Sequence, residues 1–373
     1  MSHIFKGLRI LDFTKVFSAP FATRMFADYG AEVIKIENKS APDEARFFPP
    51  LKGEWSGYFE ILNRNKKAIT LDLTNPHDLE ILYELVKQSD VFVENLAPQT
   101  KYKLRINYEI LQKINPSLIY ASLSGLGENS TKKYYDILAQ AESGLMSLTG
   151  TKEQAMKIGP SVVDAFSGMT LAFAISSALF SREKTGFGQA IAVSMKGSAM
   201  NLLESNLIEY SLTKKNPERT GNKDNLIAPF GVYNAHNTQI VVAIGNESLW
   251  NKFIEIATQY GVDFEKELFI SNENRLKNTE QLTLFVESVL QKLPKNRVVD
   301  VLTEQGIPAS YVYSMADVFD EKDNYDREFL KKINNPDVGE FVVPGKSITF
   351  SSDKNIEYTP APRVGQHNNE YGI

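Results

Sequence analysis

The stretch LRILDFTKVFSAPFATRMFADYGAEVIKIE, residues 8–37, decides the fold class of this chain. Leu8–Phe13 is short and apolar, as expected for a buried strand, and Pro20 stands where a helix favours proline, at its first position. Ala31–Glu37 is again strand-like. A strand, a helix and a second strand in so short a stretch require a crossover, so the two strands are predicted to pair in parallel.

The same alternation continues along the next part of the chain. Strands are predicted at Ala68–Leu73, Val91–Glu94 and Leu118–Leu123, and helices at Pro76–Gln88 and Tyr108–Ile114. Repeated strand–helix units predict a doubly wound, Rossmann-like α/β sheet whose ligands bind beyond the carboxyl ends of its strands. The sequence contains no GxGxxG and no Walker loop, so it gives no support to a nicotinamide dehydrogenase.

The order of elements also predicts a division into domains. Residues 1–212 form a large α/β domain that ends with a helix at Tyr135–Leu148, a strand at Gln189–Ser194 and a helix at Lys196–Leu212. The polar, turn-rich residues 213–227 are a linker. Residues 228–315 change to a short sheet followed by helices, which predicts a smaller α+β domain. Residues 316–373 form a return linker and a C-terminal segment that packs on the large domain.

Composition excludes several classes of function. The hydrophobic fraction of 42% and the charged fraction of 23% are ordinary for a soluble globular protein. A net charge of −5 argues against a nucleic-acid or anionic-membrane partner. The absence of cysteine excludes disulfides, Cys-ligated metals and cysteine nucleophiles, and four histidines without an HExxH pair make a metal site unexpected. Without a signal-peptide-like start or an uninterrupted apolar run of membrane length, we expect a cytoplasmic protein with no membrane partner.

One carboxylate stands out, at the start of the apolar stretch Ile158–Arg182. Asp164 follows the turn at Gly159 and Pro160 and precedes an uncharged run that reads as a buried helix. Two interpretations are open at this point. Asp164 caps the helix, as aspartate commonly does, or it is a nucleophile held ionised at a partly buried helix start.

Seven stretches in fixed order resemble the class III coenzyme A transferases, the CaiB/BaiF group that includes formyl-CoA and carnitine-CoA transferases. They cover residues 8–37, 63–73, 90–98, 134–150, 162–195, 228–250 and 360–368. The resemblance implies a transferase that moves coenzyme A from an acyl-CoA to a carboxylic acid. It also implies an interlocked homodimer, for which 213–227 and about 315–335 would be the linkers.

The resemblance assigns the nucleophile to Asp164. It implies that this carboxylate attacks the donor thioester, giving an aspartyl–acyl anhydride and then an aspartyl-CoA thioester that the acceptor acid resolves. Such exchanges join groups of similar reactivity, so no metal and no cofactor are implied, and coenzyme A is a co-substrate. An ionised carboxylate in a dry pocket with N–H donors nearby agrees with this chemistry.

The resemblance also implies a set of coenzyme A contacts, which makes residues 1–212 the CoA-binding domain. The contacts are Val16, Ser18, Leu71, Asn95, Leu96, Lys103, Lys133 and Met195, with supporting roles for Phe17, Tyr135 and Asp136. Plainer interpretations stay open for most of them. The apolar members are compatible with core positions, the two lysines with solvated charges, Asn95 with a turn, and Asp136 with a cap on its own helix.

Three positions depart from the family pattern. Phe17 stands where formyl-CoA enzymes have glutamine, so their substrate preference is not inherited. Asn38 replaces a common arginine and Thr74 a lysine, which weakens the expected phosphate clamp. The glycine-rich loop of formyl-CoA transferases has no counterpart between 213 and 250.

Two other functions remain open. The α-methylacyl-CoA racemases share the fold and the aspartate, but they use a histidine where this chain has Tyr135, and tyrosine is a poor base near neutral pH. A non-catalytic acyl-CoA-binding protein is the second alternative, which the departures at Phe17, Asn38 and Thr74 leave open.

Overall fold

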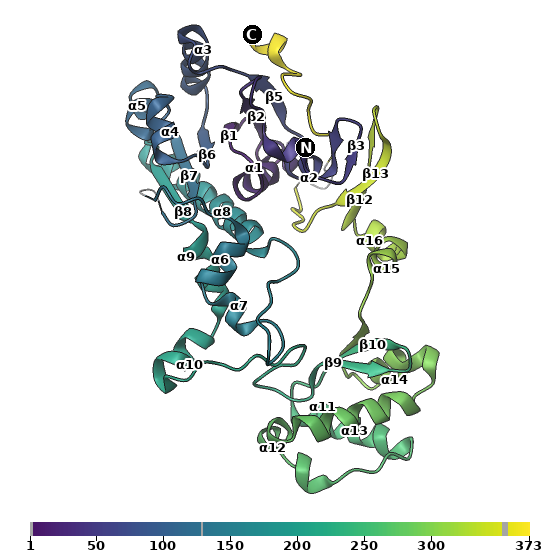
Figure 1. Ribbon diagram of the computed structural model, residues 1–373. Coiled ribbons are helices and arrows are strands. Elements are labelled where there is room, and N and C mark those ends of the chain that lie inside the picture. Colours follow the sequence, from purple (N-terminus) through teal and green to yellow (C-terminus); the bar gives the residue numbers. More distant parts are fainter. Residues whose placement is uncertain (1–2, 128–129, 353–356) are drawn as a thin grey trace. The chain divides into compact units, whose positions relative to one another are not determined.

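The computed structural model describes residues 3–127, 130–352 and 357–373, which form two compact units (Figure 1). The first unit comprises the described parts of 1–146, 157–215 and 323–373, and the second comprises 147–156 and 216–322. These limits differ from the predicted ones, because the second unit begins at 216 rather than 228 and takes in 147–156. The undescribed residues 1–2, 128–129 and 353–356 fall within the predicted spans 1–212 and 316–373.

A parallel sheet of six strands forms the centre of the first unit. Its order is β5 (Lys67–Thr70), β2 (Glu32–Glu37), β1 (Arg9–Phe13), β6 (Val91–Glu94), β7 (Ile119–Ser124) and β8 (Ala190–Ser194). All five neighbouring pairs are parallel, with Leu11 opposite Ile34 on one side and Phe92 on the other. The predicted parallel sheet is therefore confirmed. The order of the strands reverses direction between β1 and β6, which is where ligands of such sheets bind.

Helices cover both faces of this sheet. Asp12 points towards α1 (Ser18–Asp28), whose Thr23 hydroxyl donates to it at 2.7 Å. The neighbouring Leu11 joins a buried cluster with residues of α3 (Pro76–Lys87) and α5 (Tyr108–Ile114). Because adjacent side chains of a strand point to opposite faces, α1 lies on one face and α3 and α5 lie on the other. The long helix α8 (Val162–Thr185) packs along α1.

Shorter helices surround these layers. Two helices that the sequence predicts as continuous are each interrupted in the structure. Their bounds are α2 (Gly57–Asn63), α4 (Pro98–Lys103), α6 (Asp136–Glu142), α7 (Leu145–Leu148), α9 (Met195–Met200) and α10 (Asn206–Thr213). The helix predicted at Tyr135–Leu148 breaks between α6 and α7 at Gly144, which has φ +97°. The helix predicted at Lys196–Leu212 becomes α9, a 3-10 turn and α10, with a break at Glu204, which has φ +50°.

The strand predicted at Ala68–Leu73 also ends early. Leu71 still donates its N–H to the Glu37 carbonyl at 2.9 Å, but the next amide, of Asp72, donates to the Asp78 side chain at 2.8 Å. The chain therefore leaves the sheet after Thr70 and turns into α3. Loop residues 71–74 consequently lie at the carboxyl edge of the sheet.

Helix α8 is unusual in its composition. Within the described residues it is the one helix long and apolar enough to cross a membrane, a test that core helices of soluble proteins also pass. One side of it packs on α1, β7 and β8. The other side carries exposed aromatic rings, with Phe173 75% and Phe180 64% exposed.

The C-terminal segment closes the free edge of the central sheet. A hairpin of β12 (Leu330–Asn335) and β13 (Gly339–Pro344) precedes it, and a 3-10 turn (Asn368–Tyr371) lies near its end. The amide of Ala68 in β5 donates to the His367 ring at 3.0 Å, and the amide of Thr70 donates to the Asn368 side chain at 2.9 Å. These bonds satisfy edge amides that would otherwise be open to another strand.

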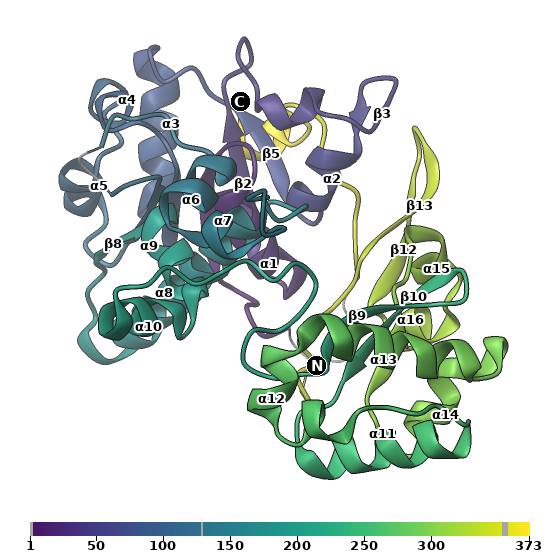
Figure 2. The same ribbon diagram turned by 60° about the horizontal axis from the view of Figure 1, so that its bottom comes forward.

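The second unit has its own small sheet and core. Strands β9 (Phe230–Ala235), β10 (Thr238–Ala243) and β11 (Ala309–Tyr311) pair antiparallel. Figure 2 shows the helices α11 (Glu247–Gln259), α12 (Asn272–Lys277), α13 (Thr279–Lys292) and α14 (Val298–Glu304) grouped with this sheet. Trp250, Phe253 and Phe285 are at the centre of the shared core. Two short helices, α15 (Met315–Asp320) and α16 (Lys322–Asp326), follow β11.

Candidate active site

Asp164 lies in the first turn of α8 and accepts a hydrogen bond from another helix. The donor is the hydroxyl of Ser18, the first residue of α1. The two helices approach closely here because residue 168 of α8 is glycine. A Cβ atom at Gly168 would lie 2.5 Å from the Ser18 carbonyl oxygen, which is too close for any larger residue without moving α1. Gly168 therefore lets Ser18 reach Asp164.

Asp136, which lies in α6, caps the start of α8 with its side-chain carboxylate. Its Oδ1 atom accepts the N–H groups of Val163 at 2.8 Å and of Asp164 at 3.2 Å, two of the amides that a helix start leaves open. Gln140 fixes this carboxylate by donating to its other oxygen at 2.6 Å. The alternative in which Asp136 caps its own helix, α6, is therefore wrong, because the side chain caps α8.

The environment of Asp164 makes its carboxylate a stronger base than an exposed aspartate. Burial raises the pKa of Asp164 to about 6, the Ser18 hydrogen bond opposes this shift, and the charge of Asp136 adds to it. At neutral pH the group is still mostly ionised. A partly desolvated, ionised carboxylate is the state that a nucleophilic role requires.

Tyr58 belongs to this site, although the sequence reasoning did not single it out. It lies in α2, and burial followed by the charges of Asp164, Asp43 and Asp136 raises its pKa to about 12. Its phenol is therefore neutral and able to donate a hydrogen bond near Asp164. No motif or periodicity in the sequence marks this tyrosine, which is why only the structure finds it.

Aromatic rings flank Tyr58. The Phe17 ring stacks on the Phe21 ring, with the two centroids 5.9 Å apart. The Phe17 and Tyr58 rings make an edge-to-face contact, and their centroids are also 5.9 Å apart. Phe48 meets Tyr58 from another direction at 5.3 Å. Phe17 therefore joins an aromatic wall beside the Ser18–Asp164 contact.

Asn95 connects the two strands at which the sheet order reverses. Its side-chain oxygen accepts the Lys15 N–H and its side-chain nitrogen donates to the Lys15 carbonyl, both at 2.8 Å. Asn95 follows β6, and Lys15 follows β1. The Asn95 side chain thus fixes the loop after β1. An asparagine that only formed a turn at the end of β6 would not make these two hydrogen bonds.

A pocket of about 200 Å³ lies at this carboxyl edge of the sheet. Its lining comes from the residues after β1, β2, β5 and β6 and from α4: Phe13, Thr14, Lys15, Ile36, Glu37, Asn38, Ser40, Ala41, Asp43, Leu71, Asp72, Leu73, Thr74, Leu96, Thr100 and Leu104. Leu71 and Leu96, two of the expected coenzyme A contacts, are among them. Within the described chain, Lys15 is the one cation of this lining.

Other expected contacts lie elsewhere in the first unit. Lys103 is exposed at the end of α4, and Lys133 is exposed before α6. Tyr135 is 60% exposed, whereas Met195 is buried at the start of α9. These four residues do not line the pocket, and their roles stay predictions. Over the described ranges, no group of three His, Cys, Asp or Glu side chains is placed to hold a metal ion.

Comparison with known proteins agrees with this architecture. Residues 5–368 match the model of CoA-transferase family III. Acetyl-CoA:oxalate CoA-transferase of Acetobacter aceti is 34% identical over 370 residues, covering 97% of this chain and 93% of that protein. Succinyl-CoA:glutarate CoA-transferase of Mus musculus is 31% identical, covering 97% and 84%. A solved CaiB/BaiF family protein from Brucella suis superposes with a TM-score of 0.87 at 29% identity, covering 99% and 98%.

The first unit is a parallel α/β sheet of the class that binds ligands beyond the carboxyl ends of its strands, and the matches identify its family. The chain belongs to CoA-transferase family III and is a class III CoA transferase.

The pKa of Asp164 leads to a prediction about stability. Asp164→Asn should make the free protein more stable than wild type near pH 7, by an amount that shrinks as pH falls from about 6 towards 4. The folded pKa of about 6 lies above the ordinary value of 3.8, so folded wild type binds this proton more tightly and loses stability as the group ionises. Denaturant unfolding at a series of pH values measures the difference.

Ser18→Ala serves as a companion variant. It keeps the carboxyl group but removes the hydrogen bond that lowers the pKa, so the pH-dependent loss of stability should shift to higher pH. A stability difference between Asp164→Asn and wild type that is the same at every pH would contradict the assignment.

Proposed function

We propose that this protein moves coenzyme A from an acyl-CoA donor to a carboxylic acid acceptor through intermediates bound to Asp164. The observation that carries the proposal is the partly buried Asp164 carboxylate, which begins α8 and accepts from Ser18. Asp136 accepts the amides of the same helix turn, so the Asp164 carboxylate is not itself the cap of α8 and is left to react.

The proposed reaction is a series of acyl exchanges. The Asp164 carboxylate attacks the thioester carbonyl and expels the CoA thiolate, leaving an aspartyl–acyl anhydride. The thiolate then attacks the aspartyl carbonyl and releases the donor acid, giving an aspartyl-CoA thioester. The acceptor carboxylate attacks that thioester and expels the CoA thiolate, which leaves an anhydride between Asp164 and the acceptor. The thiolate then attacks the acceptor carbonyl of this anhydride, forms the new acyl-CoA and frees the Asp164 carboxylate. Bonds of similar reactivity are exchanged at each step, so the proposal needs no cofactor besides coenzyme A as co-substrate.

Three groups near Asp164 support these steps. The Ser18 hydroxyl fixes one carboxylate oxygen. Tyr58 keeps its proton, because its pKa is raised to about 12, and a neutral phenol can donate to an oxyanion. The N–H groups of Ser18 and Ala19 at the start of α1 are the third group, because a helix start leaves its first amides without intrahelical partners.

The relatives narrow the choice of substrates. Those named above act on oxalate and glutarate with acetyl-CoA and succinyl-CoA, and a third, from Haloarcula hispanica, is named for mesaconate. We infer that the acceptor of this chain is also a small carboxylic acid, with dicarboxylates first among the candidates. Phe17 stands in place of the glutamine of formyl-CoA enzymes, so a formyl donor is not inferred.

Transfer is expected when acetyl-CoA or succinyl-CoA is incubated with a mixture of oxalate, glutarate and mesaconate. Mass spectrometry should detect CoA esters of the added acids, and Asp164→Asn should lower their rate of formation by about 10³-fold or more, since the nucleophile is removed. Asp90→Asn, which alters an ion pair with Arg182 away from Asp164, is the matched control and should retain transfer.

The same assay separates the alternatives when it is repeated in deuterated water with a 2-methylacyl-CoA. Deuterium at the α-carbon without any new ester would identify a racemase in spite of Tyr135. Binding of acyl-CoA without either reaction would favour a non-catalytic binding protein.

We infer that the pocket beside β1 and β6 takes the adenosine end of coenzyme A. Its volume of about 200 Å³ is below the ~300–1,000 Å³ that encloses a drug-sized ligand, so it suits a fragment such as a base rather than the whole molecule. Leu71, Leu96 and Leu104 offer apolar walls for a base. Glu37 is paired with Arg46 and Asp43 with Lys35, which leaves Lys15 to meet a phosphate.

Lys15→Ala should therefore weaken coenzyme A binding about tenfold, because a charge-assisted contact with phosphate is lost. Calorimetry with coenzyme A and with its 3′-dephospho form measures the effect and shows which phosphate Lys15 meets. Lys87→Ala, which removes a cation paired with Glu84 on α3, is the control. Lys103→Ala and Lys133→Ala test the other two expected contacts, and an unchanged affinity of Lys15→Ala would reject its role.

We also propose that the protein is a cytoplasmic homodimer, interlocked as the family resemblance implies, without membrane or nucleic-acid partners. The support is a set of large apolar side chains that are exposed in this chain, Phe173 and Phe180 of α8 and Ile208 and Leu212 of α10. Monomeric soluble proteins rarely leave so much apolar surface open. The net charge of −5 disfavours anionic lipid and nucleic acid.

Light scattering should give a mass of about twice 41.9 kDa for the purified protein, with no binding to lipid vesicles. Phe173→Glu should shift the protein towards the monomer, because a carboxylate would be buried unpaired at the interface. Leu284→Glu, at a similarly exposed position on α13, should not. A monomeric wild type, or one that binds vesicles, would contradict this proposal.

A further inference from the structure

The loop between β1 and α1 has an unfavourable backbone conformation beside the active site. Val16 has φ +68°, in the left-handed region that a β-branched residue rarely adopts. Such a conformation persists only where the surroundings hold it. Phe17 and Ser18 follow directly, so the conformation at Val16 sets the direction in which the Ser18 hydroxyl points.

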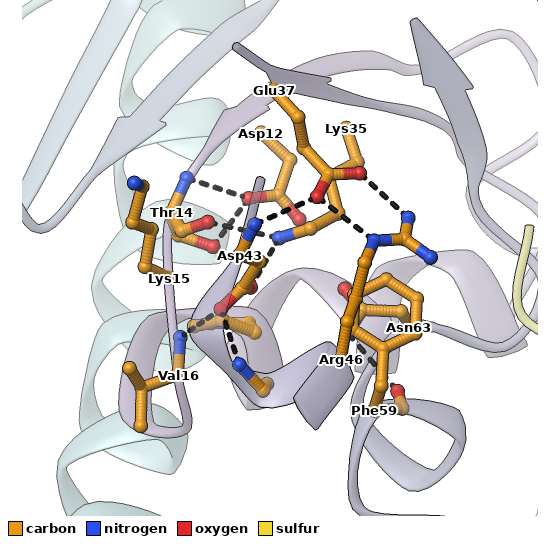
Figure 3. A network of polar contacts seen from close by, with 12 residues as sticks. Asp12, Thr14, Lys15, Val16, Lys35, Glu37, Asp43, Arg46, Phe59 and Asn63 are labelled. Atoms are coloured by element: carbon orange, nitrogen blue, oxygen red, sulfur yellow. Dashed lines mark hydrogen bonds and ion pairs between the residues drawn. The ribbon is translucent and has the colours of Figure 1, made fainter. Parts of the chain in front are cut away.

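Side chains from several elements hold this loop (Figure 3). The Thr14 amide donates to Asp12 at 3.1 Å, and the Thr14 carbonyl accepts from Lys35 at 2.9 Å. Asn95 binds both backbone groups of Lys15. The Val16 amide donates to Asp43 Oδ1 at 3.0 Å. Of these contacts, the last one acts at the strained residue itself.

Asp43 is itself held in place by several hydrogen bonds and an ion pair. Its carboxylate is fully buried, pairs with the equally buried Lys35 at 2.8 Å and accepts the Ala45 amide at 3.0 Å. Its own amide donates to Glu37, which Arg46 binds in turn. Burial opposes ionisation of Asp43, but the charge and hydrogen bond of Lys35, together with the hydrogen bonds from the Ala45 and Val16 amides, outweigh it, and the pKa of Asp43 is lowered. The acceptor for the Val16 amide is therefore a charged oxygen in a fixed place.

We propose that Asp43 is a positioning residue, which holds Val16 in the turn that aims the Ser18 hydroxyl at the Asp164 carboxylate. Asp43 itself touches no reacting atom, and it acts through the backbone of residue 16. The inference rests on the proposed function for its kinetic consequence, because Asp164 must be the nucleophile. Its geometric content, the conformation of residue 16 and the Ser18–Asp164 contact, stands apart from any reaction.

The test uses full-length variants and the transfer assay. Asp43→Asn should lower kcat about tenfold and change KM for the acyl-CoA by less than about twofold, because the misplaced group acts in the reaction step. Adding Val16→Gly to this variant should restore most of kcat, since glycine adopts positive φ without strain and needs less support. A purely structural role of Asp43 would give no such rescue.

The matched control is Asp28→Asn. Asp28 is also a buried carboxylate, and it forms ion pairs with Arg64 at 2.8 Å and with Arg24 at 3.1 Å. It lies at the C-terminal end of α1, whereas Ser18 lies at the N-terminal end. This variant should lose stability on denaturant unfolding while keeping kcat. An equal loss of kcat in Asp28→Asn and Asp43→Asn would overturn the proposal.

A second pair of variants covers the case in which Asp43→Asn does not fold. Val16→Pro leaves the buried ion pair intact but fixes φ near −65° and removes the amide that Asp43 accepts, so it should lower kcat by about 100-fold. Val16→Gly alone should lower kcat much less than Val16→Pro does, because glycine adopts positive φ without strain. Equal activity of the two variants would overturn the proposal.

Crystal structures of Asp43→Asn and Val16→Pro provide a readout that is independent of turnover. We expect residue 16 to leave positive φ and Ser18 to separate from Asp164 in both. An unchanged Ser18–Asp164 contact would overturn the proposal even if the kinetics changed. Absence of transfer in wild type together with the expected movement would instead reject the proposed function and keep the positioning role.

Discussion

The close approach of α1 and α8 is the constraint on which the active site depends. At Gly168 the two backbones are separated by less than a side chain would need, and this places the first residue of α1 against the first turn of α8. The Ser18–Asp164 hydrogen bond follows from that approach. Because each helix is anchored to the sheet by its own packing, a small displacement of either one would change the environment of the carboxylate.

Buried charge gives the same region its definite shape. Asp12 with Lys66, Lys35 with Asp43, and Glu37 with Arg46 form ion pairs at the carboxyl ends of β1 and β2. Removing such charges from water costs several kcal/mol per ion, so the pairs are weak evidence for net stability. Their geometry is what matters here, since Asp12, Lys35 and Asp43 also bind backbone groups of the loop after β1. The network thus contributes a single loop conformation, in which Val16 is held at positive φ.

The sheet topology explains why these contacts meet at one edge. Carboxyl ends of parallel strands share a side, and the reversal of order between β1 and β6 opens a crevice there. The clamp of Asn95 on Lys15, the apolar pocket and the Asp164 turn all belong to that side of the first unit. Coenzyme A is long and carries a base, phosphates and a reactive thiol. Each of these parts needs a different environment along the same edge of the sheet.

The sequence by itself determined the parallel α/β sheet and the helix start at Asp164, because the alternation of apolar runs and the long uncharged helix are local patterns. The tertiary structure decided the rest of the site. Asp136 caps α8 rather than α6, and Asn95 binds Lys15, both through contacts between residues far apart in the chain. Tyr58 comes near enough to Asp164 for the charge of that carboxylate to raise its pKa. Hydrophobic periodicity indicates which face of an element is buried, but not which distant polar group that face contacts. Only the packed tertiary structure therefore identifies these partners.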